Sequence, residues 1–448
     1  SANDIGGISP DGRRILFVRY GTPSSILSAN ATDGSDEQTI LSAENALSNF
    51  RDPQYSPDGR QVYYVRNRRV EGVESWSLNS ISTEGGVETE ILKQNTRIGE
   101  LAVLRDGTGV LMTSIDPISN LQQLYNAALP GGTKTRITND LNFYFGVSVD
   151  REGRNIVSAQ RYDESRIWVG RAGDPASIKP VSQEANVRGV VVWTPDGHIV
   201  YDAYENNRSR IWISDADGKN VQRLTNADGD DLGPQVSADG QYIVFTSNRT
   251  GRNQIWRMNS DGSDQLALTD VQGNTEFPKM DPDGQTVEFI WHRDLSHLVG
   301  RVPIIGGSIE EIPLPPSVPN VGAYYWAKSA DGKKFAHVFR DDTAARTRVA
   351  VKNTATGETE TVLDISPINI FKWLPDGSGL FYREREQGER LISKVLQIDL
   401  VKRTPRLLIS VEPETVFDLA YSIDAKRIAL IRGAGISNSV MLSAKREQ

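Results

Sequence analysis

The feature that most constrains the fold of this chain is a repeat that is written twice in nearly the same letters within residues 193–269. The first copy reads WTPDGHIVYDAYENNRSRIWISDADGKNVQRLT, and the second reads QVSADGQYIVFTSNRTGRNQIWRMNSDGSDQLALT. Asp196-Gly197 recurs 43 residues later as Asp239-Gly240, and Ile211-Trp212 recurs 44 residues later as Ile255-Trp256. A period of this length indicates a repeat architecture.

The Asp-Gly turn, or a variant of it, marks ten repeats that are spaced 43 to 48 residues apart along the whole chain. The repeats lie near residues 1–44, 45–95, 96–140, 141–185, 186–228, 229–272, 273–317, 318–366, 367–412 and 413–448. Ten copies at so regular a spacing are not a coincidence, so we treat the chain as one repeat array.

Each repeat reads as four strands separated by turns. In Ser56-Pro57-Asp58-Gly59 the proline presets φ, the aspartate bonds its own backbone and the glycine supplies a positive φ, so the chain reverses tightly. The alternating strand Val62-Tyr63-Tyr64-Val65 follows this turn. Trp168, Trp212 and Trp256 share one position in third strands, and we expect them to be buried between neighbouring blades.

Four short antiparallel strands at this period are typical of a β-propeller blade. The sequence therefore predicts an all-β fold, a β-propeller array of about ten four-stranded antiparallel blades.

How such an array closes is left open by the sequence. The first repeat opens on an inner strand at residues 3–8, and the last ends on its third strand at residues 439–442. The repeats can form one large ring, or divide near residue 185 into six regular repeats and four earlier ones. Propellers of roughly four to eight blades favour the division. The absence of a Pro/Gly/Ser-rich linker near residue 186 argues against it.

Composition restricts the class of protein. Hydrophobic residues make up 38% and charged residues 24% of the chain, which is typical of a soluble globular protein. The net charge of −8 disfavours nucleic acid as a partner.

The chain has no cysteine, which excludes disulfides, thiolate zinc sites and cysteine nucleophiles. No apolar run approaches the about 20 residues of a membrane helix, so we expect no direct membrane insertion. Because the chain begins without Met and inside a repeat, we interpret it as processed or as part of a longer polypeptide.

A catalytic set is missing from the sequence. There is no Gly-x-Ser-x-Gly motif, and no α/β segment follows the last repeat. His198 and His337 follow Asp-Gly turns on second strands, where we expect structural packing. His292 and His297, with Asp294 between them, lie in one loop, where a weak metal site is the alternative to a hydrated loop. We therefore predict no enzymatic activity and no cofactor.

Two acidic runs resemble the opening of a calcium loop but lack the glutamate that closes one. The run Asp215-Ala216-Asp217 lies where each repeat needs a turn, so turn formation explains it. The other run lies in the linker between the two copies, and its Asp228, Asp230 and Asp231 are candidates for cation or partner binding.

Aromatic clusters outside the repeat register lie in or beside the linkers that enter inner strands, on one face of a propeller. Part of each cluster belongs to the core, and the alternate residues are candidates for exposed anchors. The candidate partner-binding residues, acidic and aromatic together, are Phe50, Arg51, Tyr144, Asp230, Asp231 and Tyr324.

The Ser-Pro-Asp-Gly…Ile-Trp…Asp-Gly…Arg-Leu-Thr repeat resembles the TolB-type propeller repeat, a relative of the WD-repeat propellers. The order of repeats is also similar to the propeller region of large bacterial, especially acidobacterial, proteins. In those proteins such arrays follow a serine/threonine kinase or winged-helix module and a membrane anchor. The resemblance implies a periplasmic or extracellular location, with tethering to the membrane through a segment outside this chain.

From these observations we predict a non-catalytic scaffold or accessory subunit that binds a protein partner, in a membrane-associated complex, through one propeller face. The alternative is a ligand- or cation-sensing propeller domain of a membrane-anchored kinase or regulator.

Overall fold

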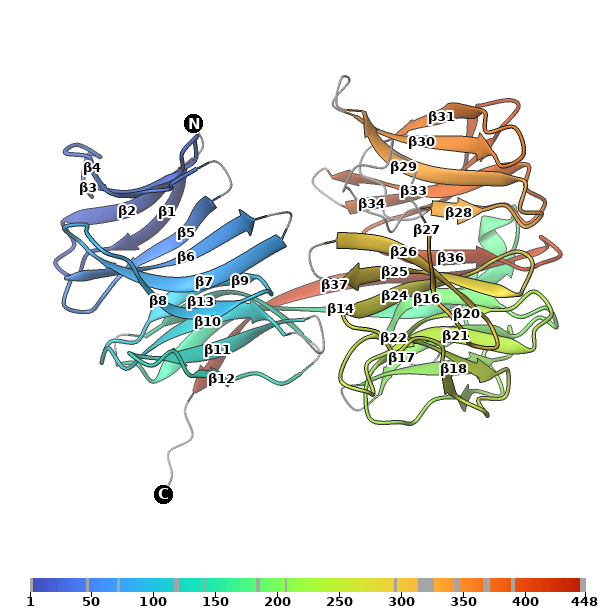
Figure 1. Ribbon diagram of the computed structural model, residues 1–448, viewed down its shortest axis with the longest axis horizontal. Helices are drawn as coiled ribbons and strands as arrows, with labels where there is room; N and C mark the ends of the chain where they lie inside the picture. The colour runs from blue at the N-terminus through green and yellow to red at the C-terminus, as the bar shows by residue number, and fades with distance from the viewer. Residues whose placement is uncertain are drawn as a thin grey trace. The chain divides into compact units, whose positions relative to one another are not determined.

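The computed structural model describes residues 3–45, 48–70, 73–116, 121–140, 142–150, 152–182, 186–205, 208–293, 296–312, 326–341, 346–365, 371–387 and 391–443. The chain folds as two units (Figure 1). Unit 1 comprises residues 1–162 and 436–448, and unit 2 comprises residues 163–435. Within the described ranges, no helix has the length and apolar character needed to cross a membrane.

The turn between the first two strands of a blade shows why the repeated letters produce this fold. At the second copy, Gly240 N–H donates to Ser237 O (2.8 Å), and Gly240 takes a φ of 73°. The Ser237 hydroxyl donates to Asp239 Oδ1 (2.6 Å), which also accepts the N–H of Gln241 (3.0 Å). The serine, aspartate and glycine thus satisfy the polar groups of the turn and supply its left-handed residue.

Unit 1 contains four sheets, which confirms the blade as the building block. Three of them are complete blades with strands in chain order: β1 (Asn3–Ile8), β2 (Arg14–Arg19), β3 (Ser25–Asn30) and β4 (Gln38–Ser42); β5 (Ser48–Tyr55), β6 (Gln61–Val70), β7 (Val73–Ser82) and β8 (Thr89–Gln94); β9 (Ile98–Val103), β10 (Gly109–Ile115), β11 (Gln122–Ala128) and β12 (Lys134–Arg136). In the fourth, β13 (Phe143–Val149) pairs with the first part of β14 (Asn155–Arg171), beside the last part of β37 (Arg427–Ser443).

Unit 2 contains five blades in chain order and a sixth of mixed origin. The five are β16 (Val187–Trp193), β17 (Ile199–Glu205), β18 (Arg208–Ser214) and β19 (Gln222–Arg223); β20 (Asp231–Val236), β21 (Tyr242–Ser247), β22 (Gln254–Asn259) and β23 (Leu266–Ala267); β24 (Asn274–Met280), β25 (Thr286–Arg293), β26 (Ser296–Pro303) and β27 (Glu310–Ile312); β28 (Trp326–Lys328), β29 (Lys334–Asp341), β30 (Arg346–Asn353) and β31 (Thr359–Ile365); β32 (Phe371–Trp373), β33 (Gly379–Gln387), β34 (Leu391–Asp399) and β35 (Pro405–Val411).

The sixth blade of unit 2 closes the ring. Its inner strands are β36 (Thr415–Tyr421) and the first part of β37, and its outer strands are the second part of β14 and β15 (Lys179–Pro180), which a short 3₁₀ turn at Pro175–Ser177 precedes. β36 lies against β16 of the first blade, where Val191 N–H donates to Asp418 Oδ2 (3.0 Å) and Trp193 Nε1 donates to Ala420 O (3.0 Å). Strands from both ends of unit 2 therefore build one blade.

The boundary between the units differs from the expected position near residue 185. The chain passes from unit 1 to unit 2 between Tyr162 and Asp163, inside β14, and returns between Gly435 and Ile436, inside β37. The fourth and tenth repeats are therefore not separate blades. Each of them contributes one long strand to both units, because the outer strands missing from the tenth repeat are supplied by the fourth.

The core of unit 2 lies between blades. One cluster joins Val200 and Ile211 of the first blade to Ile243, Phe245 and Met258 of the second, and Trp256 packs against it. Trp168 and Trp212 pack in the same way against clusters that include the preceding blade. These tryptophans lie between blades as predicted but are only partly buried, and each blade depends on its neighbours for its apolar contacts.

A single glycine tests whether the pairing of β14 with β37 holds unit 2 closed. A Cβ on Gly433 would lie 1.8 Å from Glu164 O, whereas a Cβ on Gly131 meets nothing within 4 Å. We expect Gly433→Ala to lower the free energy of unfolding by about 3 kcal/mol, because the strands must separate to admit the methyl group. Urea unfolding of the full chain measures this loss, with Gly131→Ala as the control. Equal stability of the two variants would contradict this account of closure.

Candidate functional site

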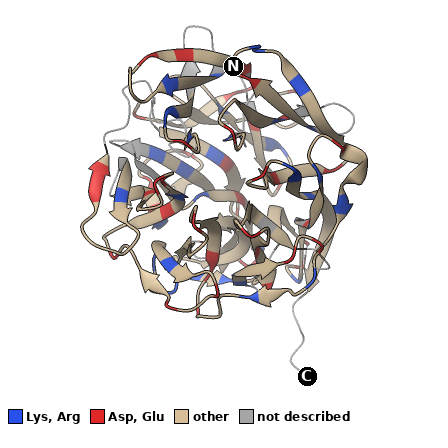
Figure 2. Ribbon diagram, turned by 90° about the vertical axis from the view of Figure 1, so that its right-hand side faces the viewer, with Lys and Arg blue, Asp and Glu red and all other residues tan. Residues whose placement is uncertain are grey.

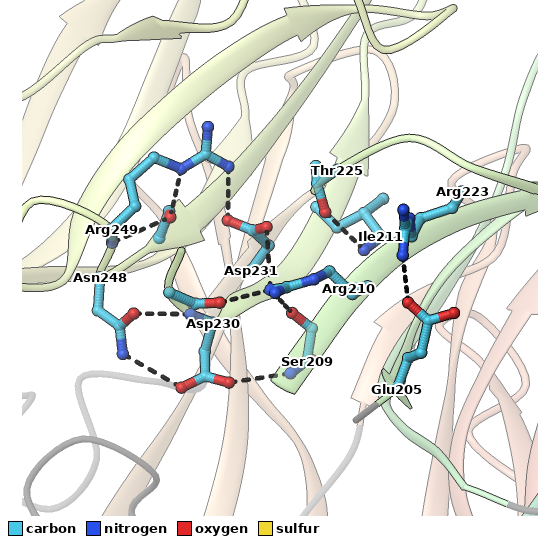
Figure 3. A network of polar contacts seen from close by, with 12 residues as sticks. Glu205, Ser209, Arg210, Ile211, Arg223, Thr225, Asp230, Asp231, Asn248 and Arg249 are labelled. Carbon is cyan, nitrogen blue, oxygen red and sulfur yellow. Dashed lines mark hydrogen bonds and ion pairs between the residues drawn. The ribbon is translucent and has the colours of Figure 1, made fainter. Parts of the chain in front are cut away.

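The acidic linker between the two clearest repeats forms a buried network (Figure 3). Asp231 is 0% exposed, and its Oδ1 accepts Arg249 Nη2 at 2.6 Å, while Arg210 Nη1 lies 3.9 Å from Oδ2. Asp230, also buried, accepts the N–H of Ser209 at 2.9 Å. The two carboxylates fasten the entry of β20 to the neighbouring blade and to the β21–β22 turn.

This network gives the two aspartates a role inside the fold. Arg249 is itself largely buried and stacks on Trp256, with 4.6 Å between its guanidinium carbon and the ring centroid. Arg210 donates to the carbonyl oxygens of Ser209 (3.0 Å) and Gly229. A buried arginine is stable only with a close carboxylate and further hydrogen bonds, and Asp231 supplies that carboxylate. Binding of a partner or cation by Asp230 and Asp231 remains a prediction, but both face arginines or backbone amides rather than solvent.

The third acidic candidate differs, because Asp228 is exposed. In the described ranges, no three His, Cys, Asp or Glu side chains are grouped so that they could hold a metal ion.

The contrast between Asp231 and Asp228 is measurable. Asp231→Ala leaves Arg249 and Arg210 buried without their carboxylate, so we expect the free energy of unfolding to fall by about 3 kcal/mol. Asp228→Ala, three residues away on the surface, should change it by less than about 0.5 kcal/mol. Chemical denaturation of both variants in parallel decides the point, and a small effect at Asp231 would mean that the network is not needed for stability.

The aromatic candidates also lie mainly inside the protein. Phe50 is fully buried and meets Tyr64 edge-on at 5.5 Å, and Tyr144 is buried with its hydroxyl donating to Asp140 Oδ2 at 2.6 Å. The expectation that these two side chains form exposed anchors is corrected: both fill the space between inner strands and their neighbours. Arg51 is half-buried, 5.8 Å from the centroid of the Trp76 ring, and Tyr324 lies outside the described residues.

Other inner-strand residues expose apolar side chains instead. Phe145, next to Tyr144 on β13, is 40% exposed, and Ile5 on β1 and Phe277 on β24 are also exposed. The sequence correctly located an aromatic cluster at residues 143–145. It could not show that Phe145, and not Tyr144, is the exposed side chain. Strand alternation gives two opposite faces, and only the packing of β13 against the preceding blade, β9 to β11, decides which one is covered.

His198, His292 and His337 belong to three different blades of unit 2. His198 lies between two turn carboxylates, Asp196 at 3.1 Å and Asp215 at 3.3 Å. His337 is buried, and burial lowers its pKa. The predicted loop pair His292 and His297 are cross-strand partners in the β25–β26 hairpin.

His292 has a carboxylate nearby, since its Nε2 lies 3.6 Å from Glu276 Oε2. Asp294 and the side chain of His297 lie outside the described residues, so the alternative of a metal site in this loop stays a prediction.

A set of carboxylates that sequence reasoning missed joins the inner strands of neighbouring blades. In unit 2, Asp418 accepts the N–H of Val191 in the next blade, and its Oδ2 also accepts Lys372 Nζ (2.7 Å). In unit 1, Asp52 accepts the N–H of Leu101 in the same way. The sequence signal is a carboxylate four residues before the first residue of the Ser-Pro-Asp-Gly turn or its equivalent.

The first blade of unit 2 has Val190 at that position, and a carboxyl group on its own second strand lies close to it. Asp202 on β17 is buried, and its Oδ1 accepts the N–H of Val190 at 2.8 Å. Burial raises the pKa of Asp202 to about 8, and the nearby charge of Asp418 adds to the rise, although the N–H groups of Val190 and Gly233 oppose it. Burial likewise raises the pKa of Asp52 to about 6.

These raised pKa values predict a pH dependence of stability. The folded state keeps the proton on Asp202 between pH 4 and 8 while the unfolded state loses it, so wild-type stability should fall as the pH rises through this window. Asp202→Asn mimics the protonated side chain, so its stability relative to wild type should increase from pH 4.5 to pH 7.5. Asp239, whose pKa is lowered by the Ser237 hydroxyl, is the control: it is ionised in both the folded and the unfolded state above about pH 4.5, so the stability of Asp239→Asn relative to wild type should stay constant from pH 4.5 to pH 7.5.

Urea midpoints at pH 4.5, 6.0 and 7.5 measure the trend at Asp202 and its absence at Asp239. A difference between Asp202→Asn and wild type that stays constant over this range would show that Asp202 does not keep its proton.

Comparison with known proteins shows which protein family part of this chain is similar to. Residues 163–313 match the family model PD40, described as the TolB beta propeller domain. This region is similar to a TolB-type β-propeller. The match begins at the first residue of unit 2 and ends after its third blade in chain order, so it covers the TolB-type repeats around the acidic linker. No curated protein matches the sequence.

Several solved structures are similar to the chain at low identity. Tricorn protease is 14% identical (TM-score 0.26, covering 96% of this chain and 46% of that one). TolB from Acinetobacter baumannii is 16% identical (TM-score 0.23, 96% and 85%), and a Mycobacterium tuberculosis puromycin-hydrolyzing peptidase is 14% identical (TM-score 0.32, 78% and 58%). The chain spans about half the length of the tricorn protease chain that it matches. Likenesses of this size carry no information on activity.

Proposed function

We propose that this protein is a non-catalytic interaction scaffold that binds a protein partner through one propeller face. The observation that carries the proposal is that buried polar side chains of unit 2 have structural roles. Asp230 and Asp418 each accept a backbone N–H of a neighbouring blade, and among the described residues no nucleophile, base and orienting group come together. TolB-type propeller repeats in unit 2 support an interaction role by analogy.

The surface chemistry favours a protein rather than a nucleic acid as the partner. Acidic and basic residues are interspersed along the blades in Figure 2, and the net charge of the chain is −8. Nucleic acid would require a basic stripe to neutralise phosphates. Exposed apolar side chains on inner strands, Phe145 and Ile5 in unit 1, supply the anchors that protein interfaces use. The extracytoplasmic location and the membrane-associated complex belong to the same proposal.

A cross-linking experiment tests the binding face. A photo-reactive phenylalanine analogue at Phe145 should give a discrete cross-linked species in the native cell, because the side chain is 40% exposed at an inner strand. The matched control is Val401, which is 89% exposed on the turn between β34 and β35, away from the inner strands. The same products at both positions, or none at Phe145, would overturn the proposed face.

A ligand-sensing propeller, in a membrane-anchored kinase or regulator, is the second candidate function. The observation that favours it is a lysine, Lys279, that projects from an inner strand of unit 2 without a carboxylate partner among the described residues.

A further inference from the structure

The last blade of unit 1 has three strands among the described residues, where the other blades of this unit have four. In the first three blades, β4, β8 and β12 cover the outer side of the third strand. In the last blade the third strand is the final part of β37, which lies beside β14. β36 pairs with β37 only as far as Gly433, so residues 436–443 have β14 as their single described neighbour. One side of this stretch therefore presents backbone N–H and C=O groups that no described strand pairs.

The edge formed by residues 436–443 has none of the features that protect other sheet edges. Its sequence, Ile-Ser-Asn-Ser-Val-Met-Leu-Ser, contains no charged residue and no proline. The outermost strands of the other blades of unit 1 are shorter or charged: β4 has five residues, and β8 and β12 carry charged side chains. Charge, proline and short length are the means by which natural edge strands avoid pairing with another chain. This edge is open to a further strand.

The side chains of this edge alternate between two different faces. Ser439 and Ser443 are exposed, and Met441 between them is 67% exposed. Val440 and Leu442 are partly buried on the other face. A strand added here must match this alternation, because a shift of one residue would place its apolar side chains on the exposed face. A strand of identical sequence has the required alternation.

We propose that a second copy of this chain pairs with the edge, residues 436–443 of the two copies running antiparallel about a two-fold axis perpendicular to the sheet. Such an axis keeps the exposed faces of both strands on the same side, so Val440 and Leu442 of the two copies share the other side. The strands carry no charge, so identical residues meet without the repulsion that opposes like charges on adjacent strands. Each copy supplies the fourth strand of the other's blade.

Cysteine cross-linking of the purified full chain tests this pairing, because the chain has no cysteine of its own. With the axis at the middle of the stretch, either Ser439→Cys or Val440→Cys places two Cβ atoms about 5 Å apart across the pair. Oxidation with diamide should convert one of these variants to a covalent dimer. The matched control is Ser443→Cys on the same strand, whose two copies would lie at least about 20 Å apart. A covalent dimer from neither variant, or equally from all three, would overturn the pairing.

A charge placed on the edge separates this pairing from non-specific association. Sedimentation velocity should show a dimer for wild type and a monomer for Met441→Lys, since a lysine on an edge strand opposes pairing. Ile423→Lys adds the same charge at a residue that is 57% exposed in the β36–β37 turn, and it should stay dimeric. Both variants should keep the circular dichroism spectrum of wild type. A monomeric wild type, a dimer that Met441→Lys leaves intact, or an assembly larger than two copies would contradict the proposal.

The edge is a surface additional to the binding face of the proposed scaffold, and its test is separate. A monomeric chain whose Ser439→Cys variant forms a mixed disulfide with a different protein would overturn the second copy as the occupant. The dimer experiments use one purified protein, so their failure leaves the scaffold proposal standing. Failure of the cross-link from Phe145 in the cell would in turn leave the dimer standing.

Discussion

The pairing of β14 with β37 is the interaction on which the structure of unit 2 depends. A propeller blade buries its apolar faces only against its two neighbours, so an open array leaves the faces of its first and last blades uncovered. Here the last blade is assembled from β36 and β37 on one side and from β14 and β15 on the other, and Asp418 and Ala420 bond it to the first blade. The same two strands continue into unit 1, which makes the closing blade the place where both units share chain.

Buried carboxylates also hold neighbouring blades together. Asp418 accepts the N–H of Val191 and pairs with Lys372, and Asp230 accepts the N–H of Ser209, each on a neighbouring blade. Such groups are costly to bury and are stable only when their partners are complete. Lys279 differs from these groups, since its ammonium donates to Trp326 O and lies over the Trp326 ring, with the charge of Glu288 nearby.

Much of the local structure was predictable, and much of the site was not. The turn at Asp239-Gly240 and the burial of Trp212 and Trp256 follow from residue chemistry repeated at a fixed period. The acidic linker was correctly singled out as unusual, yet its explanation lies in Arg249, eighteen residues beyond Asp231 and on another strand connection. Phe50 and Tyr144 were identified as aromatic outliers, but their burial depends on which face of the strand meets the next blade.

By itself, the sequence determined the repeat, its four strands, its turns and the class of fold, because these depend on contacts between residues close in the chain. Only the tertiary structure decided which strands complete the last blade, since the β14–β37 pairing joins residues more than 250 positions apart. It also decided which polar groups are neutralised: Asp231 by Arg249 and Asp418 by Lys372. Charge compensation requires proximity in space, and in a closed ring that proximity is set by the order of the blades around the axis.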